Sequence, residues 1–390
     1  MVKPTRPEDV DWTVAASAML RRAKNTATTI TDGFPHWADP ATGQWTTTAD
    51  GDWTGGALPG MLWLGYRMTG ERNIQELATE WCLKLVPRVQ LETAFKGFGF
   101  YYGAALGEIL AGDTQASRIG LEAARALLHQ YNPMLGLIPL GADAEEAGPT
   151  GSVYSSIDSL QATPLLLWAA NQTGDRAYDE CAHTHTSRVL EIHCRFNGSV
   201  IQSSELNAVN GEIVRHFTHK GISDTSVWSR AQAWAMLYCA MGFARRPDQT
   251  GWLVRGMAAA DWWLEHIPPE MVAFWDFNDP AIPDTEHDTA ATAIACAALL
   301  KLSELSPVPE DRTRYRDAAE RTAQALIMEY LTPVNPDDTR PEGMLTGGCF
   351  NKRRDSRPQD QVVNAELIFG SYFLFESLLV LSGIVSANEV

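Results

Sequence analysis

The sequence turns at Ile109-Leu110-Ala111-Gly112-Asp113, where an apolar segment ends and a charged segment begins. The same succession recurs at Asn171-Gln172-Thr173-Gly174-Asp175 and at Gly65-Tyr66-Arg67-Met68-Thr69-Gly70-Glu71, with looser versions at 245–248 and 306–310. A glycine after a helix allows the left-handed backbone that closes it, and an acidic residue beside it favours the positive end of the next helix. The repeated turn therefore predicts pairs of helices joined by short connections.

The two helices of each pair differ in composition. The helix before the turn is apolar nearly all round, as at 58–68, 100–110, 157–170, 228–243 and 290–302. The helix after it is amphipathic and charged, as at 72–85, 177–192 and 312–326. Because a helix that is apolar on every side must be buried on every side, the pairs form an inner and an outer layer. With a first helix near 10–29 and a last near 362–382, about twelve helices predict an all-α fold, an (α/α)6 barrel of six helical hairpins.

Long links join the hairpins and are the expected walls of a funnel at one end of the barrel. They span 31–57, 132–156, 197–227, 268–287 and 332–361. Links of this length are uncommon in a compact domain unless they are functional. No linker or low-complexity run divides the chain, so residues 1–390 are expected to form a single catalytic domain.

The overall charge limits the classes of partner. The chain has 45% hydrophobic and 20% charged residues, and its formal net charge is -17. A field of this sign repels phosphate, which argues against nucleic acid and against an anionic membrane surface. It leaves a small anionic substrate open, because such a molecule responds to local cations in a cleft. The oligomeric state is left open by the sequence.

Motifs for several kinds of chemistry are missing. The sequence has no dinucleotide-binding GxGxxG after a strand, no Walker motif, no GxSxG elbow and no clear strand. His183 and His185 lie two residues apart on an expected surface helix, so they point to different faces, and no HExxH pair occurs. The sequence therefore predicts neither a metal site nor a cofactor.

The termini and cysteines indicate a cytoplasmic protein. The segment 1–12 is polar and lacks a signal-type apolar run, and the most apolar stretch, 368–381, is interrupted by polar residues. The six cysteines contain no CxxC pair, and five lie in apolar helical contexts. They are expected to be buried free thiols in a reducing compartment.

Tryptophan is unusually abundant, with 13 residues. Several lie in the long links or at a helix start: Trp37, Trp45, Trp53, Trp275, Trp228 and Trp234. Indole rings that face a funnel suit sugars, whose C–H faces stack on aromatic planes. For each ring alone, packing of a long link is an equally good explanation. As a group the rings favour a carbohydrate cleft.

Three aspartates are candidates for acid–base chemistry. Asp158 lies where a polar link enters an apolar helix. It is either a first-turn residue that interacts with the helix dipole or a general acid/base at the funnel floor, where a partly desolvated carboxyl can hold a proton near neutral pH. Asp276 is a similar case, and Asp288 fits a helix N-cap.

The densest group of polar and aromatic side chains is His219-Lys220-Gly221-Ile222-Ser223-Asp224-Thr225-Ser226-Val227-Trp228-Ser229-Arg230-Ala231-Gln232-Ala233-Trp234. Arg230 falls in the first turn of an expected helix, where a cation opposes the dipole. Two explanations stay open with equal weight. Its guanidinium either binds a substrate carboxylate in bidentate fashion or forms a structural salt bridge.

A series of motifs covers nearly the whole chain. They are Trp53-Thr54-Gly55-Gly56 with Pro59-Gly60-Met61-Leu62-Trp63-Leu64, Ile157-Asp158-Ser159, His219 to Trp234, Trp275-Asp276-Phe277 with Pro280, Pro283 and Asp288-Thr289-Ala290-Ala291, and Phe369-Gly370-Ser371-Tyr372-Phe373. In type and order they resemble the unsaturated glucuronyl hydrolases of glycoside hydrolase family 88 and, more distantly, the unsaturated rhamnogalacturonyl hydrolases. The resemblance implies an (α/α)6 barrel.

The resemblance also implies a reaction. Such enzymes remove a 4,5-unsaturated uronic acid left by polysaccharide lyases, and an aspartate protonates C4 of the enol ether while water adds at C5. Asp158 matches that aspartate. Trp53, Trp228, Arg230 and Trp234 are implied to line the sugar site, together with Gln202, His219 and Lys220. The implied partner is a small oligosaccharide or glycoside.

The chain departs from the family pattern within this site. The family has a second aspartate in a His-Asp-Leu-Gly-Phe segment, where this chain has Lys96-Gly97-Phe98-Gly99-Phe100. A histidine of the family appears as Gln202, the glutamine after His219 appears as Lys220, and an expected aromatic appears as Ala57. Either Lys220 binds a substrate anion or the substrate is not the usual one.

Two other functions stay in competition with the leading one. The first is a glycosidase or lyase that acts on a saturated or modified sugar and takes a second acid/base from Asp276, Asp224 or His219. The other is a non-catalytic sugar-binding homologue that kept the cleft.

Overall fold

The computed structural model describes residues 10–145, 147–353, 355–356 and 358–390. The polar segment 1–9, part of the stretch without a signal-type run, lies outside the described residues.

Six inner helical segments form a closed ring in which each contacts the next around the ring. The second of them is continuous, because a π-helical segment, Tyr101–Ala105 (η4), joins α4 to α5. The inner segments are α2 (Ala57–Thr69), α4 and α5 (Lys96–Phe100 and Leu106–Ala111), α7 (Ala162–Thr173), α9 (Ser229–Arg245), α11 (Thr289–Leu305) and α13 (Ile368–Leu381).

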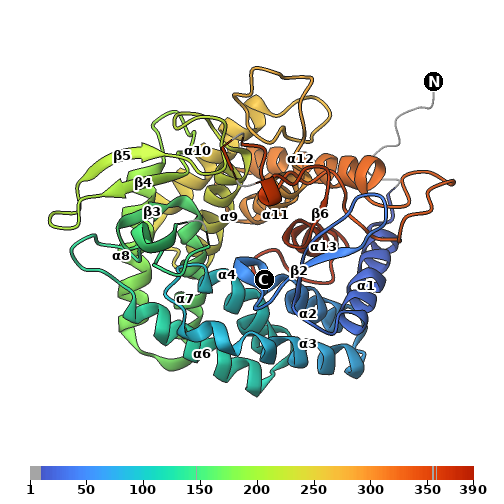
Figure 1. Ribbon diagram of the computed structural model, residues 1–390, viewed down its shortest axis with the longest axis horizontal. Helices are drawn as coiled ribbons and strands as arrows, with labels where there is room; N and C mark the ends of the chain where they lie inside the picture. The colour runs from blue at the N-terminus through green and yellow to red at the C-terminus, as the bar shows by residue number, and fades with distance from the viewer. Residues whose placement is uncertain (1–9, 146, 354, 357) are drawn as a thin grey trace.

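Six outer helices surround this ring, and each packs against an inner neighbour in sequence or, for the first, against the last inner helix (Figure 1). They are α1 (Trp12–Thr29), α3 (Arg72–Lys84), α6 (Thr114–His129), α8 (Arg176–His193), α10 (Thr250–His266) and α12 (Pro309–Tyr330). The prediction of an (α/α)6 barrel is confirmed.

Burial follows the composition of each helix. In α13 every residue from Ile368 to Val380 is buried. In α12 the buried residues form one stripe at helical spacing, Tyr315, Ala318, Ala319, Thr322, Ala323 and Leu326. A helix with a single apolar stripe covers the barrel, whereas a helix apolar on all sides belongs inside it.

The repeated turns have the predicted geometry. Gly112 and Gly174 close inner helices with φ of 62° and 71°, the left-handed conformation that a side chain disfavours. Asp113 then accepts a hydrogen bond from Ala116 N, and Asp175 accepts one from Ala177 N. Each turn therefore ends one helix and caps the next within two residues.

The expectation of no clear strand is wrong. Two antiparallel three-stranded sheets lie within and beside the long links, in the orders β2-β1-β6 and β3-β4-β5. The strands are β1 (Phe34–Ala38), β2 (Trp45–Thr48), β3 (Tyr154–Ser156), β4 (Ser203–Leu206), β5 (Ile213–Phe217) and β6 (Glu366–Leu367). None is longer than five residues, which is too short for a clear alternating pattern.

Two helix boundaries also differ from expectation. The segment predicted as a helix at 157–170 begins with a 3-10 turn, Ile157–Gln161 (η6), before α7. The helix predicted at 362–382 begins only at Ile368, because β6 precedes it. Both differences lie at the end of the barrel that carries the links.

Among the described residues, no helix is both long enough and apolar enough to cross a lipid bilayer.

A buried ion pair joins α1 to β6, the short strand that directly precedes α13. Arg22 donates to Glu366 Oε2 from Nη2 over 2.8 Å and from Nε over 3.1 Å, and Nη2 also donates to Gly43 O. The two side chains are 7% and 1% exposed. Burial raises the pKa of Glu366, and Arg22 opposes that rise. The pair therefore links the first helix of the barrel to the strand that precedes the last helix, two segments that are far apart along the chain.

We expect Arg22→Leu to lower the free energy of unfolding by about 3–5 kcal/mol, because it leaves the Glu366 carboxylate buried without its cation. Urea denaturation measures the change. Arg72→Ala is the matched control, since Arg72 and Glu76 form an exposed i,i+4 pair worth about 0.3–0.5 kcal/mol. Equal losses in the two variants would contradict this role of Arg22.

Candidate active site

Asp158 lies in η6, between β3 and the inner helix α7. Ser156 ends β3 and caps this turn: its Oγ accepts a hydrogen bond from Asp158 N over 3.2 Å and donates one to Asp158 Oδ2 over 2.6 Å. Asp158 is only 6% exposed. Sheet, turn and helix together hold a buried, oriented carboxyl group at the end of the barrel that carries the long links.

Gln202 connects Asp158 to the segment that carries His219 and Lys220. Its Nε2 donates to Asp158 Oδ2 over 3.3 Å and to His219 Nε2 over 3.0 Å. Its Oε1 accepts from Thr218 Oγ1 and from the backbone N–H groups of His219 and Lys220. Both ends of this amide are therefore used within the protein, which fits a positioning role.

Two buried histidines support the same region. His185 accepts a hydrogen bond from Ile138 N at Nδ1, so its Nε2 carries the proton and donates to Ser159 O over 2.9 Å. His193 contacts Ser155 Oγ and Ile201 O. Burial lowers the pKa of His185 to about 4 and that of His193 to about 3. Both rings are therefore neutral supports of the backbone on either side of Asp158.

A small cavity of about 20 Å³ lies beside Asp158. Its volume is enough for about one water molecule. Six of the predicted site residues line it together with two others: Trp53, Asp158, Lys220, Trp228, Arg230 and Trp234, with Phe95 and Gln161. Among these, Asp158 is the only carboxylate. We call this the floor cavity.

A wider hollow of about 530 Å³ also borders Lys220, which among the described residues is the one that lines both spaces. The wider hollow is lined by His36, Trp37, Thr48, Asp52, Glu145, His219, Lys220, Phe350, Asn351, Asp355, Ser356 and Asp360. Lys220 is 4% exposed, and its Nζ lies 3.8 Å from the centre of the Phe350 ring. Lys220 and Phe350 therefore form the boundary between the outer hollow and the floor cavity.

Arg230 forms the structural salt bridge that was one of its two explanations. Nη1 donates to Asp288 Oδ2 over 2.6 Å and to Cys349 O, and Nη2 donates to Phe350 O. Burial raises the pKa of Asp288, and Arg230 opposes that rise. The Arg230 guanidinium also lies over the Trp228 ring, with Cζ 4.5 Å from the ring centre.

The remaining nitrogen of Arg230 is different. Nε is buried and has no hydrogen-bond partner among the described residues, and Arg230 lines the floor cavity. The salt bridge therefore fixes the segment that carries Phe350 and leaves one buried donor, on a residue that lines the cavity, without a partner among the described residues.

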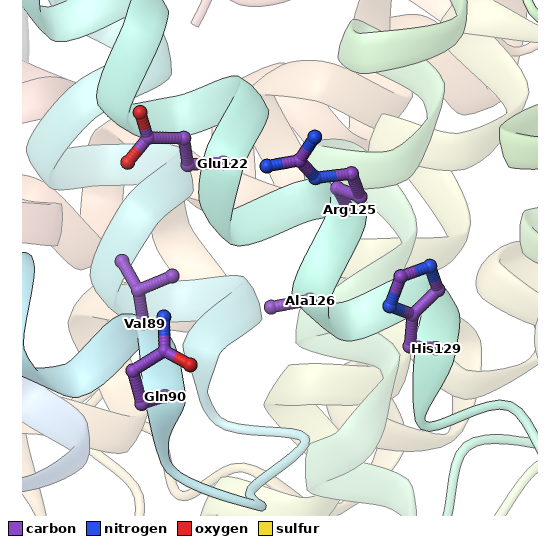
Figure 2. Close-up of a pocket in the computed structure, with 6 residues that line it drawn as sticks. All are labelled: Val89, Gln90, Glu122, Arg125, Ala126 and His129. Atoms are coloured by element: carbon purple, nitrogen blue, oxygen red, sulfur yellow. The ribbon is translucent and has the colours of Figure 1, made fainter.

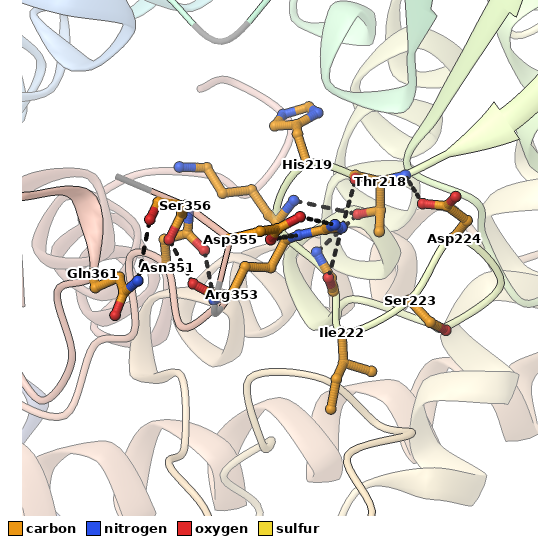
Figure 3. A network of polar contacts seen from close by, with 12 residues as sticks. Thr218, His219, Ile222, Ser223, Asp224, Asn351, Arg353, Asp355, Ser356 and Gln361 are labelled. Carbon is orange, nitrogen blue, oxygen red and sulfur yellow. Dashed lines mark hydrogen bonds and ion pairs between the residues drawn. The ribbon is translucent and has the colours of Figure 1, made fainter. Parts of the chain in front are cut away.

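A polar network joins the two segments that border the outer hollow (Figure 3). Arg353 donates to Thr218 O over 2.7 Å and to Gly221 O over 3.3 Å, and Asp355 holds the same guanidinium through two oxygens. Asp224 accepts a hydrogen bond from Thr218 N. The segment bearing Lys220 and the segment bearing Phe350 are thus tied to each other as well as to the barrel.

The other aspartates have structural contacts. Asp276 is fully buried and accepts hydrogen bonds from Ser226 Oγ, Ile222 N and Asn278 N. Burial raises its pKa, and these donors lower it. Asp288 caps α11 by accepting from Ala290 N, as predicted. Neither Asp276 nor Asp224 lines the floor cavity.

The link tryptophans divide between two environments. Trp53, Trp228 and Trp234 line the floor cavity, and Trp37 lines the outer hollow. Trp45 instead donates to Thr26 Oγ1 and packs on Arg22, and Trp275 donates to Asp279 Oδ2. Trp45 and Trp275 therefore anchor their links.

A separate hollow of about 350 Å³ lies on the outside of the barrel, between the 3-10 turn Val86–Gln90 (η3) and α6 (Figure 2). Figure 2 shows Glu122, Arg125 and His129 along the helix, with Val89 and Gln90 opposite them. Arg125 and His129 are exposed, and none of the predicted site residues lies here. The floor cavity, which gathers six of them, is the better candidate site.

Comparison with known proteins gives the same family as the motifs. The chain is 31% identical over 353 residues to the unsaturated glucuronyl hydrolase of Bacillus sp. (strain GL1), an alignment that covers 89% of this chain and 90% of that relative. The chain belongs to the unsaturated glucuronyl hydrolase family. These proteins are glycoside hydrolases, and the resemblance noted from the motifs is confirmed.

Two further relatives agree with this assignment. The unsaturated chondroitin disaccharide hydrolase of Streptococcus pneumoniae (strain ATCC BAA-255 / R6) is 28% identical over 84% of this chain and 81% of its own length. The crystal structure of the unsaturated glucuronyl hydrolase from Bacillus sp. GL1 superposes with a TM-score of 0.86 at 28% identity, covering 95% of this chain and 97% of that one. No family model matches the chain.

The position of the family's second aspartate is closed by packing in this member. Gly97 lies on α4 against η6, and a Cβ atom at this position would stand 2.2 Å from Gln161 O. Such a contact is far inside van der Waals distance, so no side chain fits without a backbone shift. In this chain η6 therefore packs directly against α4 at the position where the family pattern has a carboxylate.

Two residues of the floor cavity were missed by the sequence analysis. Gln161 is three residues after Asp158, the spacing that brings two side chains to one side of a 3-10 turn, and this spacing was a usable signal. Phe95 precedes α4 by one residue and gives no local sign of its position.

We expect the stability of the protein to fall in mild acid partly through His185. The unfolded chain takes up a proton near pH 6.5, whereas the folded pKa of His185 is about 4. The unfolded state therefore binds more protons between these values, and the free energy of unfolding decreases as the pH falls through that window. His185→Gln keeps a donor and an acceptor but does not titrate.

Urea denaturation of both proteins from about pH 7 to about pH 4.5 measures this effect. Over this range the free energy of unfolding is expected to fall by about 2 kcal/mol more in the wild type than in His185→Gln. Parallel curves for the two proteins would show that His185 is not a buried neutral group.

Proposed function

We propose that this chain hydrolyses glycosides of a 4,5-unsaturated uronic acid, with Asp158 as the acid and base. The observation that carries the proposal is the composition of the floor cavity. The cavity is lined by one carboxylate, by the cationic side chains of Lys220 and Arg230, and by aromatic rings. An acid, an anion-binding pair and stacking surfaces are the groups that a planar, carboxylate-bearing sugar requires.

One carboxylate, that of Asp158, lines the floor cavity among the described residues, which favours this reaction over ordinary glycoside hydrolysis. Retaining and inverting glycosidases use two carboxyl groups on opposite sides of the scissile bond. The other aspartates considered, Asp224 and Asp276, hold backbone N–H groups elsewhere. Protonation of an enol ether needs one group that first gives a proton and then removes one from water.

The proposed sequence of steps conserves atoms and charge. Asp158 gives its proton to C4, and the electrons of the C4–C5 double bond form the new C–H bond, which leaves positive charge shared between C5 and the ring oxygen. Water adds to C5 and returns a proton to Asp158. The resulting hemiketal opens to a ketone at C5, and the hemiacetal left at C1 releases the aglycone as an alcohol.

The remaining residues have binding and positioning roles in this proposal. Lys220 and Arg230 Nε bind the substrate carboxylate, while Trp53, Trp228 and Trp234 contact the sugar ring. Gln202 and His219 keep Asp158 oriented through the hydrogen bonds described above. No cofactor takes part.

Substrate entry requires movement of the boundary between the two spaces. A sugar ring is far larger than one water molecule, so it cannot enter a floor cavity of about 20 Å³. Lys220 and Phe350 border the outer hollow, and both side chains contact each other. We infer that the substrate displaces Lys220 from Phe350, and that the substrate carboxylate then takes the place of the ring beside the ammonium group.

The proposed substrate is a small oligosaccharide, since the outer hollow of about 530 Å³ has room for an aglycone. We further propose that the barrel acts as one catalytic domain in the cytoplasm. Six free cysteines, five of them buried, fit a reducing compartment.

Asp158→Asn tests the proposal. We expect a loss of about 10²–10⁴-fold in kcat on an unsaturated uronyl disaccharide, because the amide cannot give the proton. Turnover is followed by the loss of absorbance of the conjugated enol ether. Asn keeps an oxygen that accepts from Ser156, so the thermal unfolding temperature is expected to change little.

The matched control is Asp317→Asn, since Asp317 is exposed on the outer helix α12. Full activity of Asp158→Asn would overturn the role of Asp158. Cleavage of saturated glycosides alone would favour a different glycosidase, and sugar affinity without turnover of any substrate would favour a binding protein.

A further inference from the structure

Gln161 lines the floor cavity and carries a buried hydrogen-bond acceptor. It ends the 3-10 turn that carries Asp158, it is 1% exposed, and it lines the cavity. Its Oε1 is buried and accepts no hydrogen bond from any described residue. A buried polar atom left unpaired lowers stability, so its retention at a cavity wall points to a ligand group that pairs with it.

Arg230 Nε, described above, is a second buried atom without a partner among the described residues, and Arg230 lines the same cavity. One is a donor and the other is an acceptor, and each belongs to a residue that is 1% exposed. A carboxylate satisfies the Arg230 donor but has no hydrogen to give to Gln161. The two atoms therefore select two different groups of one ligand.

The backbone of Gln161 also packs closely against α4. Gly97 replaces the aspartate of the family pattern, and the Gln161 carbonyl occupies the space that a side chain at 97 would need. A side chain at position 97 therefore has no room beside η6, and the floor cavity is lined by the neutral amide residue Gln161 of η6.

The chemistry of the proposed substrate leaves only two partners for Gln161. An unsaturated uronosyl ring is linked through C1, has its double bond between C4 and C5, and carries its carboxylate on C5. Hydroxyl groups remain at C2 and C3 alone. We propose that Gln161 Oε1 accepts a hydrogen bond from the C2 or C3 hydroxyl and thereby selects rings in which that hydroxyl is unsubstituted; this inference rests on the proposed function.

Selection against a substituted hydroxyl follows directly. A sulfate ester at that position has no hydrogen to donate, and it brings negative charge against a carbonyl oxygen in a buried site. Gln161 is then a specificity residue for the sugar ring, separate from Asp158, which acts on C4.

The test combines one variant with three substrates. Gln161→Met has a similar shape and no strong acceptor, and the substrates are an unsaturated disaccharide and its analogues lacking the C2 or the C3 hydroxyl of the uronosyl ring. We expect Gln161→Met to lower kcat/KM on the parent disaccharide about tenfold or more. On one deoxy analogue it is expected to match the wild type, because the interaction is already missing.

For each substrate we compare the kcat/KM of the wild type with that of the variant. This ratio is independent of the intrinsic reactivity of the analogue. Gln161→Glu, which keeps an acceptor, is expected to retain more activity on the parent than Gln161→Met. An equal loss for Gln161→Met on all three substrates would overturn the proposal, because it would show a packing role. If the wild type turned over none of them, the proposed function itself would be wrong.

Discussion

The arrangement of the whole molecule depends on one constraint: helices that are apolar on every side must be covered on every side. Six such segments form the inner ring, and six helices with a single apolar stripe cover them. The apolar side chains of the inner helices are buried within the ring. The polar side chains therefore lie mainly at the end of the barrel where the links begin. The candidate site is placed at that end, on a turn that enters α7 and on the first turn of α9.

The sequence predicts the barrel well because its signal is repeated. The glycine and acidic residue at each turn, and the change from an apolar to an amphipathic helix, occur several times and support one another. The short strands could not be predicted, since Glu366 and Leu367 alone form β6 and carry no pattern. The 3-10 turn at Asp158 was also hidden within an apolar helical segment.

The candidate site was predictable in part. Trp53, Asp158 and Trp234, which belong to three separate motifs, line one cavity. The contact of Arg230 with Asp288 joins residues 58 apart in sequence, and spacing along the chain cannot give it. The structure shows the salt bridge of Arg230, because both terminal nitrogens donate within the protein, and it leaves only Nε without a partner among the described residues.

The boundary formed by Lys220 and Phe350 divides the space above the barrel into two unequal chambers. The inner chamber is lined by the start of α9, by the turn η6 that enters α7 and by Trp53 and Lys220 from two links. The outer chamber is built largely from link residues, where exchanges leave the helical core intact. Under the proposed function, an exchange of residues in the outer chamber would change the contacts with the leaving group and would leave the helical ring intact.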